Sequence, residues 1–372
     1  MQVTHYSRIL SLTLLLAFAA CSTDQTATIA SDKNVVNVYN WADYIAPDTI
    51  EKFTSEYGIK VNYDIYDGSD VVDVKLLSGN SGYDVVVHSS QYSSRLAPIG
   101  IFEKLDYSRL DNRRNLDPEL VAKVDIYAAT RGYSIPYHWG STGYAWNERL
   151  VRERLPNHPM DSSDVLFDPA VASKLADCGI TLLDGPTDIY PMVLAYLGLD
   201  PNAVDDESIA AAEAQLMLVR PYIRYFSNQK MQIDLASQEV CVAMSWSGDY
   251  AQAAARAREA GLDLTLHYTM PKEGSGLWVD GVYMPVDAPH KDNAYLFLNF
   301  LMRADIAADI ANEVHYANVN KASWPLVDPK IMNDPGIYPP KENWHVLYPV
   351  KTVDPKRERV RTRSFARVKA GI

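Results

Sequence analysis

The chain has 372 residues, of which 47% are hydrophobic and 22% charged, a composition typical of a soluble globular protein. This length exceeds what one hydrophobic core usually organises, so two lobes are expected. The formal net charge of −12 argues against nucleic acids and anionic lipids as partners, and it is compatible with a cationic solute.

The first predicted element is an export signal over residues 1–20. Its first eight residues include Arg8 and no acidic residue, and an almost unbroken apolar run follows over 9–20. This run is too short to span a bilayer, so it is typical of a signal peptide rather than a membrane anchor. No later segment is long and apolar enough to cross a membrane, and the mature protein is therefore expected to be exported.

Two cleavage sites remain open. An Ala-Ala-Cys sequence ending at Cys21 is typical of lipoprotein processing, which would lipidate Cys21 and anchor the mature protein to a membrane. An ordinary site with small residues would instead direct cleavage before Ala20. Phe18 stands where lipoproteins usually carry Leu, Val or Ile, but we favour lipidation because a cysteine occupies the expected place. The polar residues 21–33 are then expected to form a tether.

The rest of the chain alternates between predicted strands and helices. In the first region, strand, helix, strand, helix and strand are predicted in turn over 35–39, 47–57, 60–66, 70–77 and 83–87. In the second region, strands are predicted over 180–183, 240–246 and 277–286, and helices over 188–197, 208–218, 250–260 and from 295 onward. A helix with a basic outer face is predicted over 356–369. This order indicates an α/β fold with helices on both faces of a sheet.

Four residues with ligand-binding side chains follow the ends of predicted strands. They are Trp41, Ser89, Asp188 and Asp249. Ligands of open α/β sheets bind at the loops that follow the carboxyl ends of the strands. These four positions are therefore candidates for a common site.

Tryptophan and aspartate occur together three times in this chain. The pairs are Trp41 with Asp43, Trp246 with Asp249, and Trp278 with Asp280. Since the chain has only 7 tryptophans, the repetition favours a shared site over three separate packing roles. An ammonium group over an aromatic face gains roughly 0.5–2 kcal/mol, and a carboxylate adds a charge-assisted hydrogen bond. Several acids along one slot would suit a linear di- or triamine.

Apart from Cys21, the chain has two cysteines, Cys178 and Cys241. An even number of cysteines in an exported protein favours a disulfide. The alternative is a pair of buried free thiols, because cysteine is a common small core residue.

Nine segments carry a family resemblance. They are YNWADYIAPDTI, GYDVVVHSS, TLLDGPTD, IRYFS, VCVAMSWSGDYAQA, VDGVYMP, HYANVNKAS, DPGIYPP and VDPKRERVRTRSF. In order and spacing they resemble the periplasmic polyamine-binding proteins of ABC transporters, the putrescine- and spermidine-binding family. The resemblance implies a two-lobed clamp of the type II periplasmic-binding-protein fold, with the ligand cleft between the lobes. Lobe 1 would comprise 31–138 plus 283–320, and lobe 2 would comprise 142–280 plus 321–372.

By the same resemblance, acidic residues would hold ammonium groups and aromatic residues would form the walls of the site. The ten implied binding residues are Trp41, Asp43, Tyr44, Ser89, Asp188, Trp246, Asp249, Trp278, Asp280 and Tyr316. Asp188 stands where close relatives often have Glu, so its reach to the ligand is shorter. Trp278 resembles spermidine-preferring members while other positions resemble putrescine-preferring ones. The Cys178–Cys241 pair also matches a disulfide of close relatives.

The resemblance implies a solute-binding protein that closes on a polyamine and delivers it to an ABC permease. An alternative is a polyamine sensor that presents its closed form to a membrane signalling receptor, since the binding residues would be the same. An enzyme is not expected, because neither Cys178 nor Cys241 has an adjacent histidine to activate it as a nucleophile. We expect a monomer without a cofactor, and the histidines show no spacing typical of metal ligands.

Overall fold

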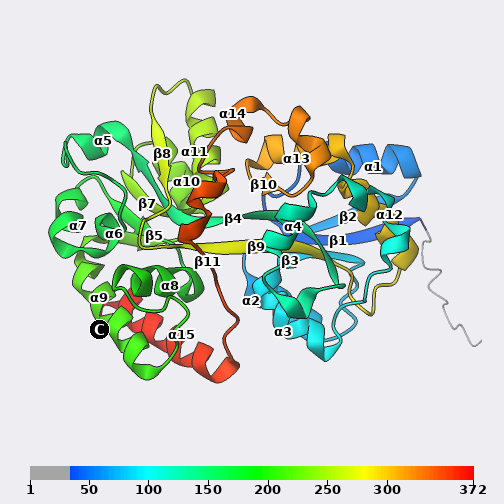
Figure 1. Ribbon diagram of the computed structural model, residues 1–372, viewed down its shortest axis with the longest axis horizontal. Coiled ribbons are helices and arrows are strands. Elements are labelled where there is room, and N and C mark those ends of the chain that lie inside the picture. The colour runs from blue at the N-terminus through cyan, green and yellow to red at the C-terminus, as the bar shows by residue number, and fades with distance from the viewer. Residues whose placement is uncertain (1–33) are drawn as a thin grey trace, which may run out of the picture. The chain divides into compact units, whose positions relative to one another are not determined.

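The computed structural model describes residues 34–372 (Figure 1). The predicted signal peptide over 1–20, Cys21 and the predicted tether over 21–33 lie outside the described residues. In residues 34–372, helices cover both faces of one mixed sheet. None of the helices in this part of the chain combines the length and the apolar character that a membrane span requires.

Eleven strands form the sheet. Their bounds are β1 Val35–Trp41, β2 Lys60–Tyr66, β3 Val85–Ser89, β4 Ser134–Asn147, β5 Ile180–Leu182, β6 Ile223–Phe226, β7 Val242–Trp246, β8 Leu266–Thr269, β9 Ser275–Tyr283, β10 Ala317–Asn318 and β11 Leu347–Pro349.

The helices lie between these strands and after them, and short 3-10 turns connect several of them. Their bounds are α1 Thr49–Tyr57, α2 Ser69–Leu77, α3 Ser90–Leu96, α4 Pro118–Val124, α5 Glu148–Arg152, α6 Asp164–Phe167, α7 Pro169–Leu175, α8 Pro186–Tyr196, α9 Asp206–Val219, α10 Lys230–Ala236, α11 Ser247–Glu259, α12 Lys291–Leu301, α13 Ala304–Val314, α14 Pro329–Met332 and α15 Pro355–Ala370.

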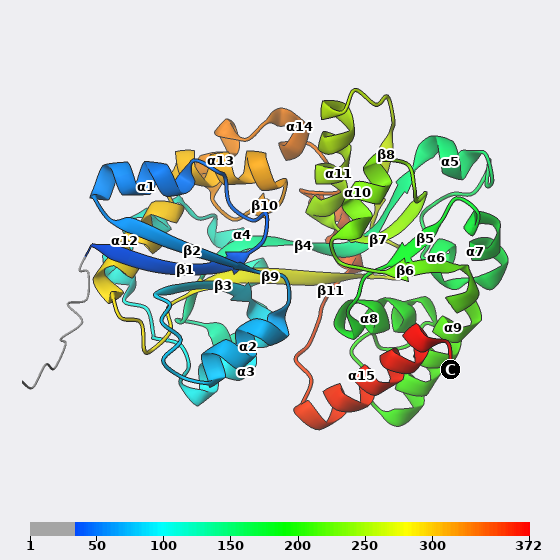
Figure 2. The same ribbon diagram turned by 180° about the vertical axis from the view of Figure 1, so that it is seen from behind.

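Two strands, β4 and β9, join the halves of the sheet. The strand order is β2-β1-β3-β9-β4-β7-β5-β6, so one half contains β1 to β3 and the other contains β5 to β7. The strand β4 pairs with β9 along most of its length and with β7 in its C-terminal half, and both strands run through the middle of the sheet (Figure 2). Side chains near the middle of these strands can therefore contact both halves.

Each half of the sheet has its own hydrophobic core, and we name the halves lobe 1 and lobe 2 by these cores. The core of lobe 1 packs β1 and β3 against α1, α12 and α13, with Phe53 and Phe297 fully buried. The core of lobe 2 packs β5 and β7 against α7, α8 and α9, and Phe365 of α15 closes it. A third cluster joins Ala253 of α11 to Ala308 of α13, so helices of the two lobes also pack together.

Most predicted elements are present, with shifted ends. The helix predicted over 250–260 begins at Ser247, because Trp246 is still extended and the chain turns directly after it. Asp249 therefore lies in the first turn of α11 instead of before the helix. The 14-residue strand β4 is not predicted by the sequence pattern, because almost all of it is buried and it shows no alternation of polar and apolar residues.

Candidate ligand-binding site

Three carboxylates lie in the region where the two lobes contact each other. Asp188 and Asp249 lie in the first turns of α8 and α11 in lobe 2, and Asp280 lies on the crossing strand β9. Asp249 and Asp280 are buried, and Asp188 is partly buried. No lysine, arginine or histidine among residues 34–372 lies within ion-pairing distance of any of the three. Such groups are rare in proteins unless a partner compensates their charge.

Neutral donors hold each carboxylate in place. The hydroxyl of Tyr44 donates to Oδ2 of Asp280 over 2.8 Å, and the hydroxyl of Tyr316 donates to Oδ1 of Asp249. Both tyrosines belong to the core of lobe 1. The Tyr316–Asp249 hydrogen bond therefore links the two lobes.

Asp188 is held by donors from two strands. Nε1 of Trp246 donates to its Oδ1 over 3.0 Å, and Oγ1 of Thr142 donates to the same oxygen over 3.3 Å. Thr142 and Trp246 face each other in the pairing of β4 with β7. The two donors thus fix the orientation of the carboxylate from one side.

Burial disfavours the charged form of all three acids. It raises the pKa of Asp280 to about 7, against which the hydrogen bond from Tyr44 acts. It raises the pKa of Asp249 to about 6, with the hydrogen bond from Tyr316 in opposition. The pKa of Asp188 is also raised by burial. Carboxylates in this state gain strongly from a cation that contacts them.

Aromatic rings surround the three acids. The side chains of Trp41, Trp246 and Trp278 are partly buried, and all three pack against the lobe 1 core that contains Tyr44 and Tyr316. The ring of Tyr316 lies 5.4 Å from that of Tyr44 and 5.3 Å from that of Trp278. Trp246 also packs against the core of lobe 2, so this indole lies between the lobes. The structure thus brings together all three predicted tryptophans.

The glycine between Trp246 and Asp249 has a steric role. A methyl group added at Gly248 would lie 2.5 Å from a ring carbon of Tyr316. This separation is too short for two carbon atoms, so the close approach of Tyr316 to α11 requires glycine at this position. The Tyr316–Asp249 hydrogen bond depends on this approach.

Two further predicted residues, Ser89 and Asp43, have different positions. Ser89 ends β3 directly opposite Asp280 of β9, next to the buried acids. Asp43 lies in the turn after β1, its side chain is 70% exposed, and its Oδ2 is 3.8 Å from Nη2 of Arg256 on α11. The structure therefore brings nine predicted residues together and places Asp43 at the rim, where it already has a basic partner.

Several residues of this site are not singled out by the sequence. Tyr137 and His138 of β4 pack with their rings 5.6 Å and 5.0 Å from that of Tyr44. Burial lowers the pKa of His138 to about 3, so the imidazole is neutral and does not repel a cation. The ring of Tyr66 lies 4.4 Å from that of Trp41, tilted by 45°. Tyr137 and His138 lie on the strand that the sequence pattern does not predict, and no spacing signal identifies them.

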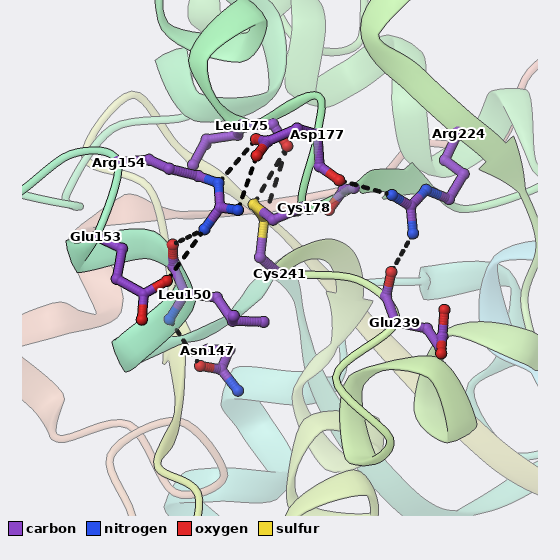
Figure 3. Close-up of a disulfide and its surroundings, with 11 residues drawn as sticks. Asn147, Leu150, Glu153, Arg154, Leu175, Asp177, Cys178, Arg224, Glu239 and Cys241 are labelled. Carbon is purple, nitrogen blue, oxygen red and sulfur yellow. Dashed lines mark hydrogen bonds and ion pairs between the residues drawn. A yellow bond between two sulfur atoms is a disulfide. The ribbon is translucent and has the colours of Figure 1, made fainter.

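The predicted disulfide between Cys178 and Cys241 is confirmed (Figure 3). It spans 63 residues and joins the segment before β5 to the residue before β7. These neighbouring strands pair through Ile180 and Val242, two residues after Cys178 and one after Cys241. Their opposite ends lead to Asp188 and Asp249, so the bridge fixes the relative position of the strands that carry these two acids.

A cavity of about 510 Å³ lies on the other face of the crossing strands. Val279 of β9 and the start of β4, Ser134 to Pro136, contribute to its lining. Since side chains alternate along a strand, Val279 faces away from Trp278 and Asp280. None of the ten predicted residues lines this cavity. The chemistry of the carboxylate site is thus separate from it.

Comparisons with known proteins agree with this architecture. The family of bacterial extracellular solute-binding proteins matches residues 48–339. The chain belongs to this family. It is 43% identical over 358 residues to the putrescine-binding periplasmic protein SpuD of Pseudomonas aeruginosa, covering 96% of this chain and 98% of SpuD. It is 42% identical to the putrescine-binding periplasmic protein PotF of Escherichia coli, covering 92% of this chain and 94% of PotF.

Solved structures of the family have the same fold. A putative spermidine/putrescine ABC transporter protein from Listeria monocytogenes matches with a TM-score of 0.80 at 28% identity, covering 90% of this chain and 99% of that one. The spermidine/putrescine substrate-binding protein PotD from Streptococcus pneumoniae matches with a TM-score of 0.76 at 25% identity, over 91% and 99% of the two chains. The predicted family and the two-lobed periplasmic-binding-protein fold are confirmed.

Proposed function

We propose that this protein captures a linear polyamine between its two lobes and delivers it to an ABC permease. One observation carries the proposal: Asp188, Asp249 and Asp280 lie together among aromatic rings, and no basic residue in 34–372 pairs with them. The names of SpuD and PotF, which cite putrescine, support the same ligand class.

The charge of the ligand follows from the energetics of the acids. Each pKa unit corresponds to about 1.4 kcal/mol between the two protonation states, so ionising Asp249 or Asp280 in the unliganded site costs about 3–4 kcal/mol more than ionising an exposed aspartate. A bound ammonium group removes much of this cost and adds a charge-assisted hydrogen bond. The site is therefore expected to bind a cation in strong preference to a neutral ligand.

The shape of the ligand follows from the aromatic lining. Ca²⁺ and Mg²⁺ prefer six or more oxygen ligands, whereas Trp41, Trp246 and Trp278 supply flat aromatic faces. Such faces attract ammonium groups and also cover methylene groups. Because Asp249 and Asp280 are held by different tyrosines, a chain with an ammonium group at each end matches them better than a monoamine.

Closure of the lobes is the proposed mechanism of capture. Three contacts join the lobes around the acids: Tyr316 to Asp249, Asp43 to Arg256, and the hydroxyl of Tyr92 on α3, which donates over 3.1 Å to Oγ1 of Thr187 on α8. A ligand that contacts both lobes shifts the population toward the closed form by its differential affinity for that form. The closed form would then dock on the permease, and the ligand would leave unchanged.

The remaining parts of the proposal concern the whole chain. We propose that the protein acts as a monomer in the periplasm, with lobe boundaries at 31–138 plus 283–320 and 142–280 plus 321–372, and with a lipid anchor at Cys21. Its relatives carry the names of binding proteins, and the two cysteines that could serve as nucleophiles form a disulfide. Both points support binding without catalysis.

Isothermal titration calorimetry tests the ligand class. The mature protein, stripped of co-purified ligand by unfolding and refolding, would be titrated with putrescine, cadaverine, spermidine and spermine. We expect 1:1 binding of at least one of them and none of n-butylamine at the same concentrations. Absence of binding to all four by a protein with a cooperative thermal transition would refute the proposal.

A further inference from the structure

Arg361 is the only lysine or arginine buried within residues 34–372, with 4% of its surface exposed. It lies on the C-terminal helix α15. Its Nη2 donates to Oγ1 of Thr187 over 3.3 Å and to Oε2 of Glu358, while its Nε has no hydrogen-bond partner. Burial of a guanidinium with incomplete hydrogen bonding costs free energy of folding, so a functional role of Arg361 is worth testing.

The guanidinium is hydrogen-bonded to the residue next to Asp188. Thr187, which accepts its hydrogen bond, directly precedes Asp188 in the first turn of α8. Tyr92 of lobe 1 donates to the same threonine oxygen. Burial raises the pKa of Asp188, and the positive charge of Arg361 is one of the influences that oppose this rise. The positive charge therefore lies close to Asp188 without forming an ion pair with it.

The other two acids lack such a buried partner. Burial raises the pKa of Asp280, and the hydrogen bond from Tyr44 opposes this rise. The base that lowers the pKa of Asp249, against the effect of burial, is Arg256. Its side chain is 40% exposed and already contacts Asp43. A buried base therefore lies next to the segment that carries Asp188, and Asp249 and Asp280 have no buried counterpart among residues 34–372.

We infer that Arg361 is a specificity-determining residue that makes the site prefer a diamine to a triamine. Its guanidinium takes the place of a third ammonium group at Asp188, and it repels any ammonium group that a longer ligand brings there. Glu358, whose side chain is 27% exposed, pairs with Arg361 and moderates this repulsion. The inference rests on the proposed function, because it assigns the number of charges that the same site accepts.

Two variants of the Arg361–Glu358 ion pair distinguish an electrostatic role of Arg361 from a purely structural one. Arg361→Gln removes the positive charge, and Glu358→Gln removes the negative charge that moderates it. Both variants lose the same Arg361–Glu358 ion pair, so a purely structural role of this pair would shift ligand affinities in the same direction in both. An electrostatic role shifts the ratio of spermidine affinity to putrescine affinity upward in Arg361→Gln and downward in Glu358→Gln.

The measurement is calorimetric titration of both amines into the full mature chain and each variant. For charges acting across a partly buried site, we expect opposite changes of about fivefold in the affinity ratio. Arg361→Lys, which keeps the charge, should retain the wild-type ratio. Arg357→Gln on the same helix, whose partner Asp206 is 84% exposed, serves as the matched control and should also leave the ratio unchanged.

The outcomes distinguish this inference from the proposed function. If the wild-type protein binds neither amine, the proposed function fails. If it binds amines but the two variants shift the ratio in the same direction, or do not shift it, the role of Arg361 is refuted. Should Arg361→Gln fail to fold, Glu358→Gln still decides, because a ratio that is unchanged or raised in that variant contradicts the repulsion.

Discussion

At the scale of single residues, the hydroxyl groups of tyrosines take the place that basic side chains would have around buried acids. Tyr44 and Tyr316 each orient one carboxylate without neutralising it. A lysine in either position would satisfy the acid and close the site to a cationic ligand. The imidazole of His138 is also neutral, so it adds no positive charge to the site.

This arrangement predicts a pH dependence of binding. The ligand needs ionised acids, but protons occupy Asp249 and Asp280 below pH values of about 6 and about 7 in the unliganded site. We expect the affinity for putrescine to fall at least about tenfold from pH 8 to pH 5, with proton release on binding near pH 6. Titrations in buffers of different ionisation enthalpy would measure both effects, and a constant affinity would contradict the raised pKa values.

The same shift has a consequence for stability. Because the pKa of Asp280 is higher in the folded chain than in the unfolded chain, its ionisation destabilises the unliganded fold as the pH rises from about 4 to about 7. Asp280→Asn should therefore raise the free energy of unfolding relative to wild type at pH 8, by up to about 4 kcal/mol, and not at pH 4. Urea unfolding at both pH values tests this, and equal effects at the two would contradict it.

The acids are also expected to differ from one another in their contribution to affinity. Asp249→Ala should weaken polyamine binding by at least about 2 kcal/mol, since it leaves a buried ammonium group without its partner. Asp43→Ala should cost less, because Asp43 is 70% exposed and contacts Arg256. Calorimetry on both variants would show the order, and an equal or larger loss in Asp43→Ala would place Asp43 against the ligand.

At the scale of the elements, the end of β7, the middle of β9 and the first turns of two helices carry the site residues. The strands β7 and β9 carry Trp246, Trp278 and Asp280, and the helices α8 and α11 begin with Asp188 and Asp249 in their first turns. Helix amino termini favour a nearby negative charge, so the helices partly offset the burial of these acids. The disulfide fixes the opposite ends of β5 and β7.

Removal of this disulfide should lower the stability of the fold more than the affinity for the ligand. In Cys178→Ala/Cys241→Ala, the unfolded chain regains the freedom of a 63-residue loop, which lowers the free energy of unfolding by roughly 2–4 kcal/mol. Denaturant unfolding with and without saturating putrescine would measure the loss. Since the native contacts of β5 and β7 remain, affinity at 25 °C should change by less than about threefold. A large affinity loss with intact stability would instead show that the bridge shapes the site directly.

At the scale of the whole molecule, we expect the ligand and the two lobes to form one cooperative unit. Trp246 packs against both lobe cores, and the Tyr316–Asp249 hydrogen bond joins the lobes through the site. A ligand that binds only this arrangement stabilises the folded chain by about 2.7 kcal/mol at a hundredfold excess over its dissociation constant. Thermal unfolding of the wild type should show this increase. Asp249→Ala at the same ligand concentration serves as the control and should show little.

The amino-acid sequence by itself determined the family, the order of strands and helices, and the pairing of tryptophans with aspartates. These features are local, because residue spacing and strand periodicity record them within short segments. The disulfide could also be predicted from the sequence, since only two cysteines remain after Cys21.

Only the tertiary structure decided which charges meet. Asp43 contacts Arg256, and Arg361 reaches Thr187 beside Asp188, through contacts that join distant segments and leave no local pattern. The strand β4, which brings Tyr137, His138 and Thr142 to the site, is buried along nearly its whole length and lacks the alternation that reveals a half-exposed strand. Burial and the pairing of distant charges are properties of the folded chain, and they set the pKa values and the number of ammonium groups that the site accepts.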